Sequence, residues 1–267
     1  MSTDATTPRY FDIKDGRIFA HVREGNGPAL VFLHYYGGSQ RTWRPVIERL
    51  RPDRPYVAHD QRGWGESAVV PGPYNIDQLA DDAQQIIDQL GYDEFVLVGH
   101  SMGGKAAQVL AARRPTGLVG VVLVAPAPAA PAGEVTPEAQ DFMVHAYDTV
   151  ESVHRAIDGP LTNGGLSDKD RAQVVDDSVH GAQEAKEAWP LHAILEDHSA
   201  RVAAIDVPVL VLAGSDDKVD PPQVLREHLL PMLPTATLRE LRGTGHLSPL
   251  EVPDQIATHI EAFVGSL

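Results

Sequence analysis

The stretch Phe95-Val96-Leu97-Val98-Gly99-His100-Ser101-Met102-Gly103 carries the strongest local signal in the chain. Residues 95–98 form an apolar run that predicts a buried strand, and residues 105–114 predict a helix just beyond it. A serine in a tight turn between a strand and a helix has strained backbone dihedral angles, and the glycines two residues to either side relieve the crowding. Because this turn lifts the hydroxyl above the sheet, we predict that Ser101 is a nucleophile.

The rest of the chain repeats this alternation of strand and helix. Short runs typical of strands occur at residues 29–33, 56–58, 119–124, 207–212 and 237–241. Apolar runs without polar alternation predict strands that are covered on both faces. The spacing of apolar residues predicts one helix over residues 76–90, stopped by Gly91, and a terminal helix over residues 253–263. The pattern predicts an α/β fold with a mostly parallel central sheet flanked by helices.

One segment interrupts the alternation. Residues 125–133 form a connector rich in proline and alanine, which can neither continue a strand nor start a helix cleanly. Residues 136–200 are polar and helix-prone, and no strong strand signal returns until Val207. We therefore predict a small helical cap over residues 129–203, inserted between two parts of one core, residues 1–128 and 204–267.

A serine hydroxyl is a poor nucleophile near neutral pH and needs a base that a third group holds in place. The candidate base is His246, in the loop Gly243-Thr244-Gly245-His246 directly after the last predicted strand. A loop bracketed by glycines at this position can present an imidazole over the edge of the sheet. Its position after the last strand, rather than its residue type, singles out His246 among the 12 histidines of the chain.

The third group is expected after the preceding strand, because serine, acid and histidine follow one another in that order on this sheet topology. Asp216, Asp217 and Asp220 all lie just beyond the strand at residues 207–212. Order along the chain does not separate them, and some of them could instead cap the helix that begins near Pro222.

Four separated blocks carry a resemblance to a known family. In chain order they are Leu33-His34-Tyr35-Tyr36-Gly37-Gly38-Ser39, Asp60-Gln61-Arg62-Gly63-Trp64-Gly65-Glu66-Ser67, residues 99–104, and Gly243-Thr244-Gly245-His246 followed by Leu250-Glu251. The chain resembles the α/β-hydrolase superfamily and, within it, the branch of serine esterases, C–C hydrolases and cofactor-free haloperoxidases. The resemblance runs from about residue 10 to residue 263, and it implies the α/β-hydrolase fold with the cap inserted after the sixth strand.

The resemblance also assigns site residues. The family's Gly-x-x-Asp turn falls on residues 214–217 and favours Asp217 as the acid. The backbone N–H groups of Met102 and Tyr36 are expected to form an oxyanion hole. The residues expected to bind substrate are His34, Tyr35, His100 and Trp189.

The chain departs from the family pattern at Tyr35, where glycine is usual. The pair Tyr35 and Tyr36 could add a hydroxyl donor to the pocket, or both rings could pack at its wall. Residues 62–67 are expected to shape a turn beside the pocket, and Lys105 is expected to be solvated. Cap residues that could line the pocket from above are Phe142, His145, Tyr147 and His192, although packing explains them equally well.

The expected reaction is acyl transfer to water through an acyl-enzyme on Ser101. The small cap favours a small carboxylic ester or lactone. Hydrolysis of a C–C bond in a β-diketone-type substrate and perhydrolysis use the same three residues and remain open, as does a non-enzymatic small-molecule receptor. The resemblance implies no metal and no organic cofactor. The related dehalogenases and epoxide hydrolases are set aside because they carry aspartate at the position of Ser101.

Composition limits the partners and the location. The net charge of −15 disfavours nucleic acids and anionic membranes as partners. With no cysteine, the chain has neither disulfides nor a cysteine nucleophile. Residues 1–9 lack the apolar core of a secretory signal, and no run of about 18 apolar residues suggests a membrane span. We therefore expect a cytoplasmic protein, and the oligomeric state stays open.

Overall fold

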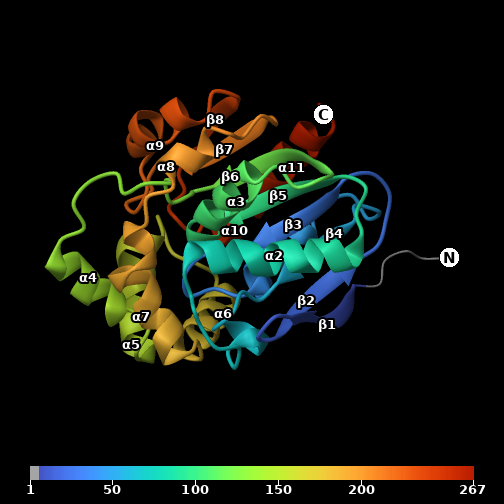
Figure 1. The fold of residues 1–267 in the computed structure, drawn as a ribbon. Coiled ribbons are helices and arrows are strands. Elements are labelled where there is room, and N and C mark those ends of the chain that lie inside the picture. Colours follow the sequence, from blue (N-terminus) through green and yellow to red (C-terminus); the bar gives the residue numbers. More distant parts are fainter. Residues whose placement is uncertain (1–5) are drawn as a thin grey trace.

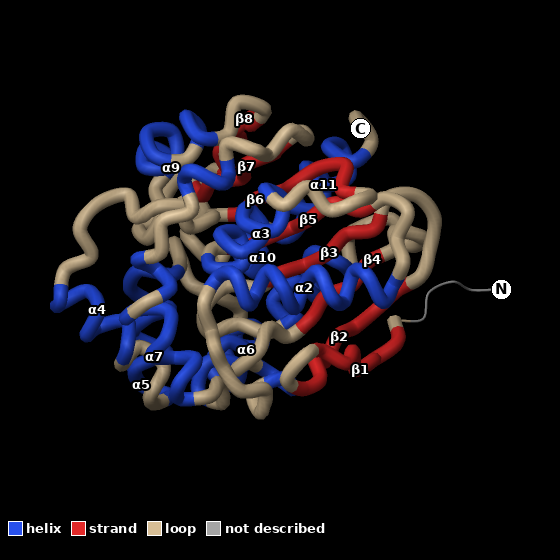
Figure 2. The backbone as a smooth tube through the Cα atoms, viewed as in Figure 1, coloured by secondary structure: helices blue, strands red, loops and turns tan. Residues whose placement is uncertain are grey.

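An eight-stranded sheet forms the centre of the molecule (Figures 1 and 2). The computed structural model describes residues 6–267, so part of the polar segment at residues 1–9 lies outside the described residues. The strands are β1 (Thr7–Ile13), β2 (Gly16–Arg23), β3 (Ala29–Leu33), β4 (Tyr56–His59), β5 (Phe95–His100), β6 (Leu118–Val124), β7 (Val209–Gly214) and β8 (Ala236–Leu241). Their order in the sheet is β1-β2-β4-β3-β5-β6-β7-β8.

The sheet is parallel from β4 to β8 and antiparallel only where β1 pairs with β2 and β2 with β4. The six strands predicted from local runs are present as β3 to β8. No local run marked β1 and β2, and their burial explains why. Most side chains of β1 are exposed, and those of β2 alternate in burial, so neither strand has a continuous apolar run.

Helices cover both faces of the sheet, because successive side chains of a strand point to opposite sides. Val31 and Leu33 of β3 join the core beneath α2 (Ile76–Leu90) and α3 (Met102–Ala112). Leu30 and Phe32 join a second core beneath α1 (Arg44–Ile47) and α11 (Pro253–Val264). Figure 1 shows α2 in front of the sheet and α11 behind it. The α/β-hydrolase fold predicted from the sequence is confirmed.

The predicted cap is a set of helices between β6 and β7. They are α4 (Pro137–Val144), α5 (Val150–Ala156), α6 (Asp168–Val179), α7 (Gln183–Leu191) and α8 (Ser199–Val202). In Figure 1, α4, α5 and α7 gather to the left of the sheet. The division of the chain at residues 129 and 203 stays a prediction.

The remaining elements are short. Two more helices are α9 (Pro222–His228) and α10 (Ser248–Glu251), and single helical turns occur at Gln40–Trp43, Gly65–Ser67, Ile157–Leu161, Ala193–Leu195 and Leu230–Met232. Among residues 6–267, no helix combines the length and apolar character needed to cross a bilayer.

A buried ion pair ties the loop after β4 to α2. The guanidinium of Arg62 donates through Nε and Nη2 to the two carboxylate oxygens of Asp82, at 2.6 and 2.7 Å. The third nitrogen, Nη1, donates to the carbonyl oxygen of Pro71. Both side chains are almost completely buried. Arg62 therefore fixes this loop against α2, and the position of residues 62–67 beside the pocket stays a prediction.

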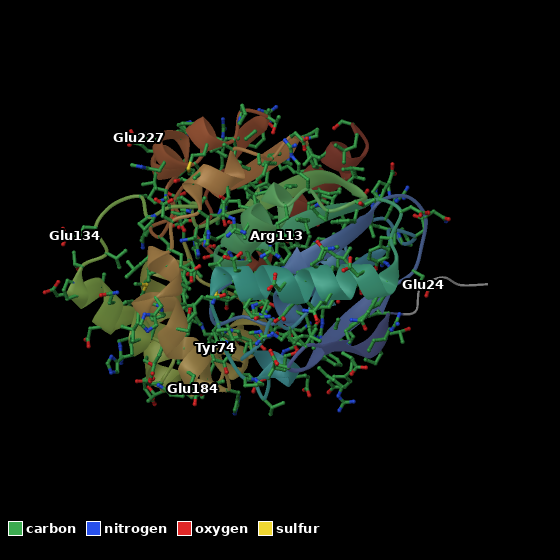
Figure 3. All side chains as sticks on the ribbon, in the orientation of Figure 1. Glu24, Tyr74, Arg113, Glu134, Glu184 and Glu227 are labelled. Carbon is green, nitrogen blue, oxygen red and sulfur yellow. The ribbon has the colours of Figure 1, made fainter. Side chains whose placement is uncertain are left out.

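We expect Arg62→Met to destabilise the protein by about 3–5 kcal/mol, because it leaves Asp82 as a buried charge without its partner. Arg113→Met is the matched control. Arg113, labelled in Figure 3, pairs with Asp77 and Asp81, which lie on the exposed side of α2, the helix that also carries Asp82. Exposed pairs contribute about 1 kcal/mol or less. Urea unfolding measures both variants, and equal losses would contradict the importance of burial here.

Candidate active site

Ser101 occupies a strained turn between β5 and α3. Its backbone has φ 53° and ψ −117°, a conformation that residues other than glycine rarely adopt. The glycines around it make room for the turn. A Cβ atom on Gly103 would lie 2.5 Å from the carbonyl oxygens of Leu33 and His34, and one on Gly99 would lie 2.5 Å from the carbonyl oxygen of Gly103. The crowding inferred from the sequence therefore arises because the backbone at Gly99 and Gly103 lies close against other backbone segments.

The imidazole of His246 bridges Ser101 and Asp217. His246 Nε2 lies 2.9 Å from Ser101 Oγ, and His246 Nδ1 lies 2.9 Å from Asp217 Oδ2. All three side chains are buried. The structure thus brings together the three residues predicted to form the triad, which come from three separate loops beyond β5, β7 and β8. Asp216, in contrast, is exposed and accepts a hydrogen bond from the hydroxyl of Ser215.

Local hydrogen bonds fix the acid and the imidazole. Asp217 Oδ1 accepts from the backbone N–H groups of Val219 and Asp220, at 2.8 and 3.1 Å. The loop that carries His246 is held by Glu251, whose Oε2 accepts from the N–H of Gly245 at 3.0 Å. These bonds leave Asp217 Oδ2 directed at the imidazole and the imidazole directed at Ser101.

The electrostatics of this pair favour an imidazolium beside a carboxylate. Burial lowers the pKa of His246, but the charge and hydrogen bond of Asp217, with smaller contributions from Asp220 and Glu251, raise it by more, so the net shift is upward. Burial raises the pKa of Asp217, yet His246 and two backbone N–H groups make the net shift downward. Both directions stabilise the state that forms when the imidazole takes a proton.

Two backbone N–H groups near the ends of β3 and β5 are without a protein acceptor among the described residues. Within residues 6–267, neither Tyr36 nor Met102 donates its backbone N–H to another protein group. Met102 is the first residue of α3, where the N–H groups of a helix have no partner within the helix. These are the two groups that the sequence predicts for the oxyanion hole, and that role stays a prediction.

A small cavity of about 230 Å³ lies over Ser101. Its walls come from the connector after β6 and from Met143, Trp189, Ile194 and Val219. Most of these side chains are apolar, and the volume is below the roughly 300–1,000 Å³ of sites for drug-sized ligands. Trp189 therefore lies where a substrate-binding residue was predicted.

Tyr36 joins the loop after β3 to the cap. Its hydroxyl lies 2.6 Å from the carbonyl oxygen of Lys186 in α7 and 3.2 Å from that of Met143 in α4. In return, its own carbonyl oxygen accepts from the hydroxyl of Tyr147 at 3.0 Å. The ring also packs among those of Trp64, Tyr147 and Trp189. The ring of Tyr36 therefore packs against other rings, and its hydroxyl hydrogen-bonds to the cap. Tyr36 does not line the cavity over Ser101.

His34, Tyr35 and His100, which were predicted to bind substrate, do not line the cavity over Ser101. Both histidines have no exposed surface, and Tyr35 has 2 %. His34 Nε2 accepts from the N–H of Gln61, and His100 Nε2 lies 2.8 Å from the carbonyl oxygen of His246. The ring of Tyr35 packs against that of His100. These three side chains pack in the interior, against the loops after β3, β4 and β8, and none of them lines the cavity.

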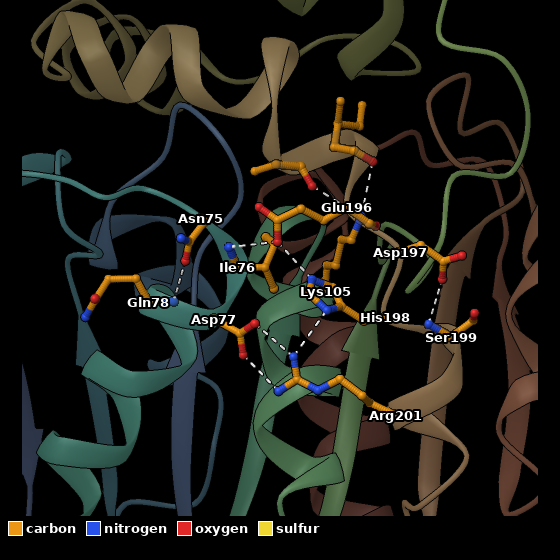
Figure 4. A network of polar contacts seen from close by, with 12 residues as sticks. Asn75, Ile76, Asp77, Gln78, Lys105, Glu196, Asp197, His198, Ser199 and Arg201 are labelled. Carbon is orange, nitrogen blue, oxygen red and sulfur yellow. Dashed lines mark hydrogen bonds and ion pairs between the residues drawn. The ribbon is translucent and has the colours of Figure 1, made fainter.

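Lys105 is also placed differently from the prediction. Its side chain is 1 % exposed rather than solvated, and its ammonium donates to the carbonyl oxygens of Ala193, Ile194 and Glu196, at 3.3, 3.1 and 2.6 Å (Figure 4). Burial lowers its pKa to about 8. Lys105 thus binds the returning end of the cap to the helix that begins after Ser101.

The cap residues separate into two groups. Tyr147 and Trp189 are buried, and Trp189 lines the cavity, whereas Phe142, His145 and His192 are mostly exposed. Sequence reasoning did not single out Met143 or the connector as cavity walls, because nothing local shows which face of a short helix meets the core. Among the described residues, no group of three or more His, Asp or Glu side chains is arranged to hold a metal ion.

Comparison with known proteins identifies the family. The model of the alpha/beta hydrolase family matches residues 30–259. The chain therefore belongs to the α/β-hydrolase family and is a hydrolase, as the sequence blocks predicted.

Individual relatives cover most of the chain. It is 29% identical over 252 residues to the 3-oxoadipate enol-lactonase 2 of Acinetobacter baylyi, a match that covers 91% of each chain. It is 26% identical over 262 residues to a non-heme chloroperoxidase of Kitasatospora aureofaciens, covering 87% of this chain and 90% of that one. The crystal structure of the enol-lactonase from Burkholderia xenovorans matches with a TM-score of 0.83 at 25% identity, covering 96% of this chain and 100% of that one.

We expect Gly103→Ala to destabilise the protein by about 2–4 kcal/mol, because the added methyl group meets rigid backbone oxygens. Gly159→Ala is the control, since a Cβ atom there has no neighbour within 4 Å. Thermal and urea unfolding of the two variants measure the difference. A Gly103→Ala protein as stable as the control would show that β3 and α3 can separate without cost.

Proposed function

We propose that the protein is a serine hydrolase that acts on a small carboxylic ester or lactone through an acyl-enzyme on Ser101. The observation that carries the proposal is the bridging position of His246, whose Nε2 lies 2.9 Å from Ser101 Oγ and whose Nδ1 lies 2.9 Å from Asp217 Oδ2. Ser101 in turn lines a small and mostly apolar cavity. The family membership and the enol-lactonase relatives support the same reaction class.

In the first half of the reaction, His246 Nε2 takes the proton of Ser101 as Oγ attacks the carbonyl carbon. The tetrahedral intermediate places its oxyanion toward the N–H groups of Tyr36 and Met102, and such donors are typically worth about 3–4 kcal/mol each in the barrier. The intermediate collapses as the imidazolium gives its proton to the leaving alkoxide oxygen. In a lactone, this oxygen stays attached to the acyl chain.

In the second half, His246 takes a proton from water, and the hydroxide oxygen attacks the acyl carbon. Collapse of the second intermediate releases the carboxylic acid and returns the proton to Ser101 Oγ. Asp217 stays ionised throughout and holds the proton on Nδ1, so that Nε2 faces Ser101.

Other reactions at the same three residues are outcomes of the test. The relative named as a non-heme chloroperoxidase keeps perhydrolysis as the second candidate, and cleavage of a β-diketone is a further one. A receptor without turnover would need the same cavity but no activated Ser101.

We expect wild type to hydrolyse short p-nitrophenyl esters at least a hundredfold faster than Ser101→Ala, because removing Oγ removes the bond-forming atom. The cavity volume predicts that the rate falls as the acyl chain lengthens beyond a few carbons. Ser266→Ala, an exposed serine near the C-terminal end, is the control and should match wild type. Equal rates for wild type and Ser101→Ala would contradict the proposed nucleophile, and inactivity on all esters would direct the search to β-diketones and lactones.

We expect kcat/KM to fall as the pH is lowered, with a midpoint above 6.5. A protonated His246 cannot accept the proton of Ser101, and the net shift of its pKa is upward from 6.5. Initial rates with a soluble acetate ester between pH 5 and 9 give the midpoint. A flat profile would count against His246 as the base, and a midpoint below 6.5 would contradict the upward shift of its pKa.

A further inference from the structure

The cavity over Ser101 contains a carboxyl group that no part of the triad explains. Asp220 lines this cavity together with Ser101. Its backbone N–H donates to Asp217 Oδ1, which places the residue directly beside the acid of the triad. Its side chain is half-buried, and no described residue donates a hydrogen bond to its carboxyl oxygens or forms an ion pair with them. Polar groups enclosed in a protein are normally hydrogen-bonded, so this group is available to a ligand.

The other charged side chains around the cavity are not available in the same way. The ammonium of Lys105 directs its three protons at backbone carbonyl oxygens of the cap. Glu134, the residue directly after the connector, is exposed at the surface (Figure 3). The remaining walls are largely apolar. Asp220 is therefore the polar side chain that a bound molecule meets inside the cavity, apart from Ser101 itself.

The charges around Asp220 limit what it can bind. A carboxylate ligand would lie beside Asp220 and Asp217, while the positive charge of Lys105 has no proton left to donate to it. An ammonium ligand would lie beside Lys105 and the imidazolium that forms on His246 during the reaction. An uncharged hydrogen-bond donor meets neither repulsion, and the hydroxyl group is the common donor of that kind in small esters and lactones.

The protonation of Asp220 is compatible with this role. Burial raises its pKa to about 7, while His246 and Lys105 act in the opposite direction and Asp217 adds to the increase. Near neutral pH the group therefore exists in both forms. The ionised form accepts a hydrogen bond, and the protonated form still offers its carbonyl oxygen as an acceptor.

We propose that Asp220 is a specificity-determining residue, which accepts a hydrogen bond from an uncharged hydroxyl group on the ester or lactone that reacts with Ser101. The inference rests on the proposed function and names its substrate class: small hydroxylated esters and lactones. The geometry that carries it is one unpaired carboxyl in a mostly apolar cavity, adjacent to the triad.

Two pairs of size-matched esters test the proposal. Methyl 3-hydroxybutyrate and methyl butyrate differ by a hydroxyl in the acyl group, and 3-hydroxybutyl acetate and butyl acetate differ by a hydroxyl in the alcohol. Proton release in a pH-stat gives kcat/KM for each ester. In one of the two pairs, we expect wild type to prefer the hydroxylated ester at least tenfold.

Variants then assign this preference to Asp220. Asp220→Leu should bring the ratio to within about twofold of one, whereas Asp220→Asn should keep most of it, because the amide oxygen still accepts. Asp216→Asn, which changes an exposed neighbouring acid outside the cavity, should keep the wild-type ratio. Since the Asp220 carboxyl accepts no hydrogen bond from the protein, its substitution removes no folded-state contact of that kind.

The outcomes separate this inference from the proposed function. If Asp220→Leu leaves the ratio unchanged in both pairs, or if wild type prefers methyl 3-aminobutyrate or monomethyl succinate over the hydroxylated ester, the inference is overturned while ester hydrolysis stands. If no ester is hydrolysed, the proposed function fails, and the inference is judged by binding. Calorimetry on Ser101→Ala should then show weaker affinity for methyl 3-hydroxybutyrate when Asp220→Leu is added, and equal affinities overturn it.

Discussion

The backbone of Ser101 is the constraint on which the rest of the site depends. A positive φ at a residue with a side chain costs about 1–3 kcal/mol and persists only where surrounding contacts hold it. Those contacts come from three directions: Gly103 lies against the end of β3, Gly99 against the start of α3, and Gly104 against Pro126 in the connector. The turn therefore fixes the loop that carries Tyr36, the first residues of α3 and the origin of the cap relative to one hydroxyl group.

Buried charges then attach the cap to this frame. The three carbonyl oxygens that surround the ammonium of Lys105 belong to residues 193–196, which follow α7 and lead back toward β7. The next contact in the same region joins Glu196 Oε2 to the N–H of Ile76 at the start of α2, and to Nε2 of His198 (Figure 4). A buried ammonium is costly unless its protons are used, and here all of them are. Hydrogen bonds in this way join α3, which begins directly after Ser101, to residues 193–196 at the end of the cap.

The sequence predicted the features that depend on a local pattern of residues. It did not predict those that depend on packing between elements distant in the sequence. The turn at Ser101 and the strands β3 to β8 follow from short runs of residues, and so does the loop of His246. Asp217 was separable from Asp216 and Asp220 only through the family resemblance, because all three follow β7. The positions of His34, His100 and Lys105 could not be predicted, since the burial of a polar side chain depends on partners distant in sequence. β1 and β2 gave no signal because they lie at the partly exposed edge of the sheet.

Tyr36 has a consequence for how a ligand reaches Ser101. Its hydroxyl is bonded to cap helix α7, its carbonyl oxygen receives the hydroxyl of Tyr147, and its N–H is a proposed oxyanion donor. A cap that swings away to admit a large molecule must break the two hydrogen bonds of the Tyr36 hydroxyl and carbonyl oxygen. It thereby frees the residue whose N–H is the proposed oxyanion donor. If the N–H of Tyr36 is the oxyanion donor, wide opening of the cap and stabilisation of the oxyanion therefore make opposing demands on one residue.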